Sequence, residues 1–228
     1  MPNLFEPPPP PVVQIIGSTA AFPVHRIYCV GRNYAEHAKE MGAPVDREQP
    51  TFFMKPADAI VTGDRDVPYP PGTTNLHHEV ELVVALHSGG SAIAASDALS
   101  HVHGYAVGLD LTRRDLQAAA KAKGLPWDTA KGFDASAPIS AIAPASAIGH
   151  PSIGELWLEV GGERRQHADV GDMIFAVPEI IAALSLLYTL AAGDLIYTGT
   201  PSGVGPLRRG DTFRAGFAGH VTLEGRIV

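Results

Sequence analysis

Apolar and polar positions divide the chain into short apolar runs separated by clusters of Gly, Pro, Asn and Asp. Runs rich in β-branched and aromatic residues between such turn signals predict β-strands. The predicted strands cover residues 27–30, 51–54, 76–86, 157–160 and 195–198. Gly161 and Gly162 follow one of them and predict a two-residue hairpin turn. Residues 57–75 and the last residues of the chain are typical of turns and short strands.

Start signals, stop signals and helical spacing of apolar residues predict four helices. They cover residues 35–41, a short segment within 92–103, residues 113–123 and residues 177–190. Gly42 and Pro44 end the first helix, and Ser96 or Asp97 is expected to cap the second. Thr112 is the expected cap of the third. The fourth has the clearest amphipathic spacing, so we assign it to the core without a chemical role.

The predicted strand over residues 76–86 carries the most informative polar positions. Side chains alternate along a strand, so Glu79, Glu81 and His77 are expected on one face. Two neighbouring carboxylates resist burial unless a cation lies between them, and oxygen ligands favour Mg²⁺ or Mn²⁺. Asp110, which ends the apolar run 104–109, is the best third ligand. The alternative is an edge strand with a solvated acidic face.

Other polar residues permit a catalytic and an ordinary interpretation. His37 and Glu40 lie three apart and share a helix face, which suits a general base held by a carboxylate, or else a solvated helix. Arg114 and Gln117 are similarly spaced, close to Asp110. Residues 127–140 are interpreted as a loop in which Lys131 would ordinarily be solvated. The Gly-rich segment 199–206 offers backbone N–H groups to an anion, but it lacks a P-loop ending.

Composition narrows the functional class. The 228 residues are 45% hydrophobic and 18% charged, with a formal net charge of −7, which indicates a globular protein with no nucleic-acid partner. The one cysteine, Cys29, fits a reducing compartment. We see no secretory signal, and the apolar stretch 180–192 is too short and too polar to span a bilayer. The expected setting is therefore the cytoplasm, with no membrane partner.

Several of these segments occur together and in an order that resembles the fumarylacetoacetate hydrolase family. The matching positions are 31–34 with His37 and Glu40, 76–81, 108–112 with Arg114, Asp115 and Gln117, 123–127 with Lys131, 172–175 and 198–201. The resemblance covers about residues 25–225. It implies an α+β, β-rich domain built on a rolled β-sheet, commonly a homodimer. Residues 1–24 are then a proline-rich N-terminal arm and entry, and residues 25–228 the catalytic domain.

The resemblance also implies the roles of the candidate site residues. Glu79, Glu81 and Asp110 become the metal ligands, for Mg²⁺ or Mn²⁺. His37 with Glu40 becomes the water-activating pair, and Lys131 with the Thr200 region supplies donors to the oxyanion. Arg114 and Gln117, together with Arg32 and Thr200, are the expected substrate-binding residues. His37 lies on a short helix flanked by Gly31 and Gly42, so it is expected to belong to a lid.

Within the family, the chain is most similar to short acylpyruvate hydrolases, and in segments 22–26, 112–115 and 177–181 to fumarylpyruvate hydrolases of gentisate-type aromatic degradation. The expected substrate is a small 2,4-dioxo acid that is cleaved at a carbon–carbon bond. A general acylpyruvase, or an oxaloacetate decarboxylase or isomerase of the same family, is the nearer alternative. A non-catalytic, metal-containing binding protein is the farther one. Arg32, Arg113 and Arg114 are candidates for binding a second substrate carboxylate, and the sequence does not rank them.

Overall fold

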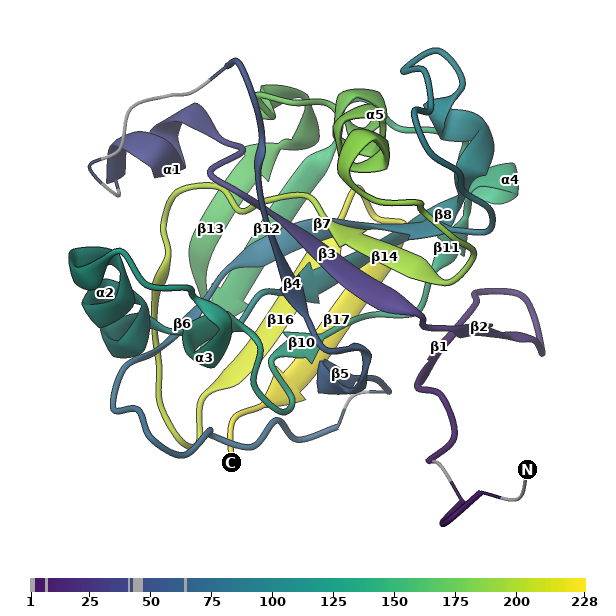
Figure 1. The fold of residues 1–228 in the computed structure, drawn as a ribbon. Coiled ribbons are helices and arrows are strands. Elements are labelled where there is room, and N and C mark those ends of the chain that lie inside the picture. The colour runs from purple at the N-terminus through teal and green to yellow at the C-terminus, as the bar shows by residue number, and fades with distance from the viewer. Residues whose placement is uncertain (1–2, 7, 41, 43–46, 64) are drawn as a thin grey trace.

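A six-stranded mixed sheet crosses the centre of the molecule (Figure 1). The computed structural model describes residues 3–6, 8–40, 42, 47–63 and 65–228. In spatial order the strands of this central sheet are β11 (Ala143–Pro144), β8 (Val102–Leu109), β7 (Val80–Leu86), β14 (Asp194–Tyr197), β3 (Arg26–Gly31) and β4 (Thr51–Lys55). β14 and β3 are parallel, whereas every other neighbouring pair is antiparallel.

A second, four-stranded antiparallel sheet packs against one face of the central sheet. Its strands, in spatial order, are β13 (Glu163–Asp169), β12 (Glu155–Val160), β16 (Thr212–Phe217) and β17 (Val221–Arg226). Alternate β7 residues, Leu82 and Val84, share a buried core with Leu156 and Leu158 of β12. Because strand side chains alternate between faces, Val83 of β7 lies in a separate core on the opposite face. Both faces of the central sheet are therefore covered.

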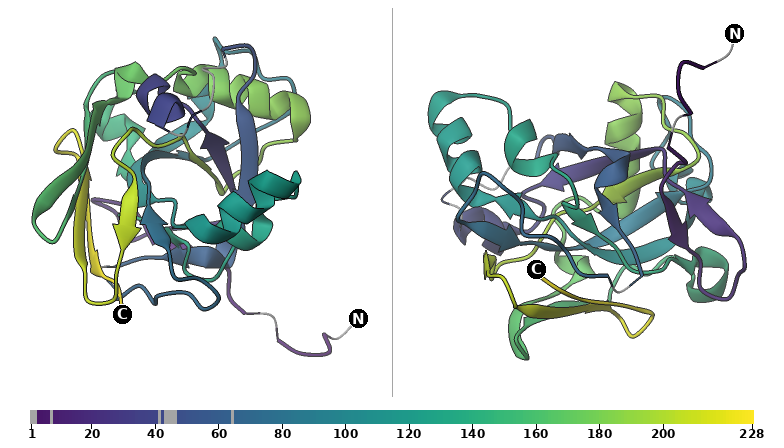
Figure 2. Two further views of the ribbon diagram at one scale, coloured as in Figure 1. Left: turned by 90° about the vertical axis from the view of Figure 1, so that its left-hand side faces the viewer. Right: turned by 90° about the horizontal axis from the view of Figure 1, so that it is seen from below.

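Shorter strand pairs surround the two main sheets. They are the three-stranded sheet β15 (Gly205–Leu207), β6 (Leu76–His78) and β9 (Thr112–Arg113), the parallel pair β10 (Ala137–Pro138) and β5 (Ile60–Val61), and the hairpin β1 (Val12–Gln14) and β2 (Ala21–Pro23). The described residues ahead of β1 extend away from the sheets (Figure 2).

Helices are short and lie around the central sheet. They are α1 (Ala35–Glu40), α2 (Arg114–Lys123), α3 (Asp128–Lys131), α4 (Ala145–Ile148), α5 (Val177–Leu187) and the 3₁₀ helices η1 (Ala57–Ala59), η2 (Ala98–His101) and η3 (Val170–Asp172). Within the described residues, none has the length and apolar character needed to cross a bilayer. The architecture confirms the expected α+β, β-rich class.

Most predicted elements are present. The strands β3, β4, β12 and β14 form where apolar runs predicted them, and Gly161 and Gly162 connect β12 to β13. The helix predicted over residues 177–190 is α5, which ends at Leu187. The first predicted helix is α1, observed to Glu40. Its expected last residue, Met41, and the stop signal Pro44 lie outside the described part of the chain.

Three local predictions were wrong. Thr112 does not cap α2, because it belongs to β9 and its hydroxyl donates to the Asp110 carbonyl at 3.1 Å. Neither Ser96 nor Asp97 caps η2 through its side chain. The segment 127–140 is not only a loop, because it contains α3 and β10. At Thr112 the pairing of β9 with β6 replaced the expected local capping signal.

Candidate active site

The expected strand over residues 76–86 is interrupted at Glu79. β6, which precedes it, pairs in the three-stranded sheet, whereas β7, which follows it, lies in the middle of the central sheet. The backbone N–H of Asp110 donates to the Glu79 carbonyl at 2.8 Å, and Glu81 lies opposite Gly108 on β8. This pairing brings both glutamates beside Asp110. Because β7 is buried along its whole length, the solvated edge-strand interpretation is wrong.

The three carboxylates form one buried cluster. One ligand oxygen from each of Glu79, Glu81 and Asp110 lies within 4.8 Å of the others, and the residues are only 5%, 1% and 0% exposed. Burial, followed by repulsion from Asp110 and Glu79, raises the pKa of Glu81 well above its usual range. Gly199 offsets part of this cost, since its N–H donates to Glu81 Oε2 at 2.8 Å. The Gly-rich segment thus presents a backbone donor to an anion inside the protein.

Three cations from other elements compensate the cluster. Lys131 Nζ donates to Glu79 Oε2 at 2.7 Å and to Asp110 Oδ2 at 2.5 Å, and Arg114 donates to Glu79 Oε1. Lys55, at the end of β4, places its ammonium 2.8 Å from Asp110 Oδ1. Although burial opposes its charge, Asp110 and Glu79 raise the pKa of Lys131 above its usual value. The interpretation of Lys131 as a solvated loop lysine is therefore wrong.

The donor set fits a hard divalent cation. The three groups offer only oxygen atoms, which is the ligation that Mg²⁺ and Mn²⁺ prefer. Asp110 Oδ1 accepts no hydrogen bond from the described residues, despite the nearby Lys55 ammonium. Among the described residues, this is also the only group of three or more His, Cys, Asp or Glu side chains whose ligand atoms lie this close together.

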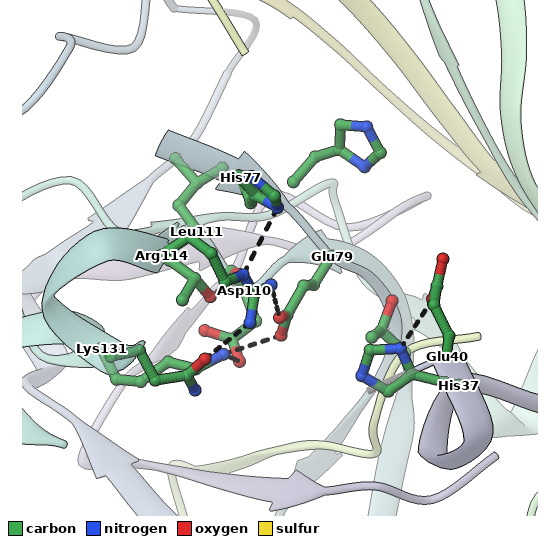
Figure 3. Close-up of polar contacts among 12 residues, drawn as sticks. His37, Glu40, His77, Glu79, Asp110, Leu111, Arg114 and Lys131 are labelled. Atoms are coloured by element: carbon green, nitrogen blue, oxygen red, sulfur yellow. Dashed lines mark hydrogen bonds and ion pairs between the residues drawn. The ribbon is translucent and has the colours of Figure 1, made fainter. Parts of the chain in front are cut away.

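His37 and Glu40 form a second group, separate from the carboxylate cluster (Figure 3). Both come from α1, and His37 Nδ1 lies 3.2 Å from Glu40 Oε2. Glu40 Oε1 also accepts a hydrogen bond from the Gly203 N–H at 3.2 Å. The His37 side chain is only 7% exposed, and its burial lowers its pKa. His37 is therefore held neutral, with one ring nitrogen on Glu40, and the solvated-helix interpretation is wrong for it.

Gln166 connects the second sheet to the site, and no motif or spacing around it selects it from the sequence. Its Oε1 accepts from the Val80 N–H at 3.0 Å and lies 2.9 Å from His78 Nδ1. Its amide group donates to Thr200 Oγ1 at 2.8 Å and to the Pro201 carbonyl at 2.9 Å. Because Thr200 Oγ1 already accepts a hydrogen bond, its own hydrogen remains available to a ligand.

The carboxylate cluster and His37 line one hollow of about 390 Å³, a volume that includes its open mouth. Its walls are Val30, Gly31, Arg32, His37, Phe53, Glu79, Glu81, Asp110, Arg114, Gln117, Lys121, Trp127, Lys131 and Thr200. Every candidate site residue except Glu40 is thus brought to this hollow. Arg114 Nη1 donates to Gln117 Oε1 at 2.6 Å, so those two candidates are fixed to one another.

Some expectations about the site need revision. His77 does not join the carboxylates, because its Nδ1 accepts from Arg114 Nε at 3.3 Å and its Nε2 lies 2.9 Å from Asn75 Oδ1. Lys55 and Lys121 were not selected from the sequence. Lys55 ends a predicted strand, and no local signal distinguishes it from a solvated lysine. Lys121 could have been found, because it lies at helical spacing from Arg114 and Gln117.

Comparisons with known proteins agree with this geometry. A family model described as "Fumarylacetoacetate (FAA) hydrolase C-terminal" matches residues 26–228. The crystal structure of fumarylpyruvate hydrolase from Pseudomonas aeruginosa in complex with Mn²⁺ and pyruvate is 47% identical to this chain. It superimposes with a TM-score of 0.97 over 100% of this chain and 99% of that chain.

Two further relatives have different names. The mitochondrial oxaloacetate tautomerase of Mus musculus is 47% identical over 201 residues, which are 88% of this chain and 90% of that protein. The structure of 5-carboxymethyl-2-hydroxymuconate delta-isomerase from Mycobacterium smegmatis is 32% identical, with a TM-score of 0.80 over 92% of this chain and 78% of that chain. The same scaffold therefore occurs with hydrolase, tautomerase and isomerase names.

Proposed function

The chain belongs to the fumarylacetoacetate hydrolase family, and we propose that it is a metal-dependent hydrolase of 1,3-dicarbonyl acids that cleaves fumarylpyruvate to fumarate and pyruvate. One observation carries this proposal: the buried carboxylate cluster and His37, whose ring lies against Glu40, line the same hollow from separate elements. Such a site can hold a metal ion and a general base that does not ligate it. The similarity to a fumarylpyruvate hydrolase solved with Mn²⁺ and pyruvate supports the substrate and the ion.

The metal ligands in this proposal are Glu79, Glu81 and Asp110, and the ion is Mg²⁺ or Mn²⁺. When bound, the ion supplies a Lewis acid to the carboxylate and keto oxygens of the pyruvyl half of the substrate. Lys55, Lys131 and Arg114 pair with Asp110 and Glu79, and their three positive charges equal those of the three carboxylates once Glu81 is also ionised to bind the ion. A divalent cation therefore leaves the site with two excess positive charges. These charges favour a 2-oxo acid whose leaving group develops a second negative charge beside its carboxylate.

His37 is the proposed general base. Glu40 fixes one ring nitrogen, and burial lowers the pKa of His37, so the other nitrogen can accept a proton from water at neutral pH. Glu40 also stabilises the imidazolium that results. The position of this pair on the short helix α1, opposite the carboxylates, is compatible with a lid.

Lys131 and Thr200 are the proposed donors to the oxyanion. An ammonium has three N–H donors. Lys131 directs two of its donors at Glu79 and Asp110, which leaves one for a ligand. The Thr200 hydroxyl is oriented by Gln166 and keeps its own donor. The proposed substrate-binding residues are Arg32, Arg114, Gln117 and Thr200, all of which line the hollow.

The direct test is steady-state kinetics of the Mn²⁺- and Mg²⁺-loaded protein with fumarylpyruvate, acetylpyruvate and oxaloacetate, followed by product analysis. We expect stoichiometric fumarate and pyruvate from fumarylpyruvate, with no turnover in excess chelator. Much faster cleavage of acetylpyruvate than of fumarylpyruvate would assign the protein as a general acylpyruvase. Tight metal binding without turnover of any of the three would favour a binding protein.

A second candidate activity is the tautomerisation of oxaloacetate. It is favoured by the 47% identity to the oxaloacetate tautomerase of Mus musculus over most of both chains. Enol–keto exchange requires proton transfer at the same chelated 2-oxo acid but no attack by water. Adding enol-oxaloacetate and following its ultraviolet absorbance measures this activity. Catalysed decay of the enol without cleavage of fumarylpyruvate would replace the first proposal by the second.

The assembly and the compartment are also proposals. We propose a homodimer, which the resemblance to the family supports and which light scattering coupled to size-exclusion chromatography measures. We propose the cytoplasm as the compartment, because the single cysteine, Cys29, is buried and free. The curated relatives are named as mitochondrial proteins, so fractionation of the source cells is the relevant measurement.

A further inference from the structure

Two cations of the hollow have no carboxylate partner among the described residues. Arg32 is exposed and makes no hydrogen bond or ion pair with the described residues. Among the same residues the Lys121 ammonium has no hydrogen bond or ion pair either, and it lies 5.1 Å from the centroid of the Trp127 ring. Burial, and after it the charges of Arg32 and Arg114, lower the pKa of Lys121. Unlike Lys131 and Arg114, these two cations are therefore free to bind an anion from solution.

Lys121 lies at a defined place relative to the carboxylate cluster. Arg114, Gln117 and Lys121 occupy positions i, i+3 and i+7 of α2, and all three line the hollow. Seven residues of α-helix span about 10 Å. One face of α2 therefore runs from Arg114, which contacts the cluster through Glu79, to Lys121 two turns farther along. An extended seven-carbon chain with a carboxylate at each end matches this separation once the side-chain lengths are included.

An aromatic wall lies between the two ends. The rings of Phe53 and Trp127 are 6.2 Å apart between centroids. The Lys131 ammonium lies 4.9 Å from the centroid of Phe53, at the cluster end, and Lys121 lies over Trp127. Both aromatic residues line the hollow. The planar CH=CH unit of a conjugated acyl chain can pack against this wall without losing hydrogen bonds, because that unit carries no polar atom.

We propose that Lys121 and Arg32 form a binding site for the distal carboxylate of the substrate, so that the enzyme selects acylpyruvates whose unsaturated acyl chain ends in a carboxylate. This inference rests on the proposed hydrolase function and names the residues that determine its specificity. It also chooses among Arg32, Arg113 and Arg114, the three candidates for this carboxylate that the sequence did not rank. Arg114 is bound to Glu79, and Arg113 donates to the Thr129 carbonyl and stacks on Phe133, so only Arg32 remains free.

The experiment compares fumarylpyruvate with acetylpyruvate, which has a methyl group in place of the carboxyvinyl group. The measured quantity is the ratio of kcat/KM for the two substrates in the Mn²⁺-loaded enzyme. Lys121→Met and Arg32→Gln should each lower this ratio at least tenfold, mainly through KM for fumarylpyruvate, because a charge-assisted contact is lost. Lys121→Arg should retain most of the ratio. Lys123→Met, an exposed position on the same helix, is the matched control and should change it less than twofold.

Product inhibition gives an independent readout. Fumarate carries the distal carboxylate and pyruvate does not, so Lys121→Met should raise the inhibition constant of fumarate at least tenfold and that of pyruvate much less. If Lys121→Met leaves both the substrate ratio and fumarate inhibition unchanged while the parent enzyme cleaves both substrates, the carboxylate site is refuted and the hydrolase function stands. If the parent enzyme cleaves neither substrate, the hydrolase function itself is refuted and the inference falls with it.

Discussion

Replacing His37 by alanine should separate water activation from metal binding. The imidazole lines the hollow, but its only described hydrogen-bond partner is Glu40, and it is not one of the three clustered carboxylate ligands. A positioned general base contributes about 10²- to 10⁴-fold to rate, which corresponds to about 3–5 kcal/mol of transition-state stabilisation. We therefore expect hydrolysis to fall by that factor, with Mn²⁺ affinity within threefold of the parent value.

Glu40→Gln should have a smaller effect of the same kind. The amide oxygen can still accept from His37, so the ring keeps its orientation, but the charge that stabilises the imidazolium is lost. Because the Glu40 side chain is 37% exposed, solvent screens this charge, and we expect a loss of about tenfold, or 1.4 kcal/mol.

The direction in which the rate changes with pH provides a second test of the His37–Glu40 pair. Burial lowers the pKa of His37, whereas Glu79 and Glu40 raise it. The neutral base is active above its pKa, so kcat/KM should fall only as pH decreases below the ordinary histidine value of about 6.5. Removing the Glu40 charge should move this acidic limb to still lower pH.

Isothermal titration with Mn²⁺ and acylpyruvate absorbance assays measure the two quantities. Lys39→Ala is the control, because Lys39 lies on the same helix and its one ion pair within the described residues is with exposed Glu36. Hydrolysis by His37→Ala within threefold of the parent rate, or loss of Mn²⁺ binding in that variant, would refute the assignment of the base.

Three further predictions concern the cluster and its supports. Excess chelator should abolish hydrolysis and Mn²⁺ should restore it, while Glu81→Gln should weaken Mn²⁺ binding in calorimetry; full activity in chelator would contradict the metal site. Lys131→Met leaves two buried carboxylates without their shared cation, so the metal-free protein should lose about 3–5 kcal/mol of unfolding free energy. Mn²⁺ should recover part of this loss in denaturant titrations, and equal losses with and without the ion would count against a shared charge site. Gly199→Ala places a Cβ 2.6 Å from that of Asn33 at a φ of +99° and should cost about 2–4 kcal/mol. Gly210→Ala, with a φ of +93° and open space around it, should cost only about 1 kcal/mol by thermal unfolding.

The sequence predicted those features whose signal is local or belongs to an ordered set of motifs. Apolar runs located β3, β4, β12 and β14, and helical spacing located α5. The proximity of Glu79 and Glu81 followed from strand alternation, although the strand is in fact interrupted between two sheets. The addition of Asp110 required its position at the end of an apolar run. The cluster could therefore be predicted without knowing which sheet each strand enters.

The residues that hold the site side chains in place could not be predicted in this way, because their partners are distant in sequence. Lys55 reaches Asp110 because β4 ends beside the cluster, and Gln166 reaches Thr200 because the second sheet packs there. Nothing in the residues around Lys55 or Gln166 indicates a buried partner. The missed Thr112 strand has the same cause, since its pairing with β6 is a tertiary contact that outweighs a local capping preference.

The cations around the carboxylate cluster change the physical reason for a metal ion at this site. From sequence, the cost of burying two carboxylates predicted a cation between them. The structure shows that Lys55, Lys131 and Arg114 pair with Asp110 and Glu79, and the raised pKa of Glu81 favours its neutral form, so the fold does not depend on an ion to neutralise the cluster. These cations also hold the carboxylates close together, with Asp110 Oδ1 lacking a hydrogen bond from the described residues. A divalent ion at this place is therefore surplus positive charge. Such charge stabilises the anion that forms when the carbon–carbon bond breaks, rather than the folded chain.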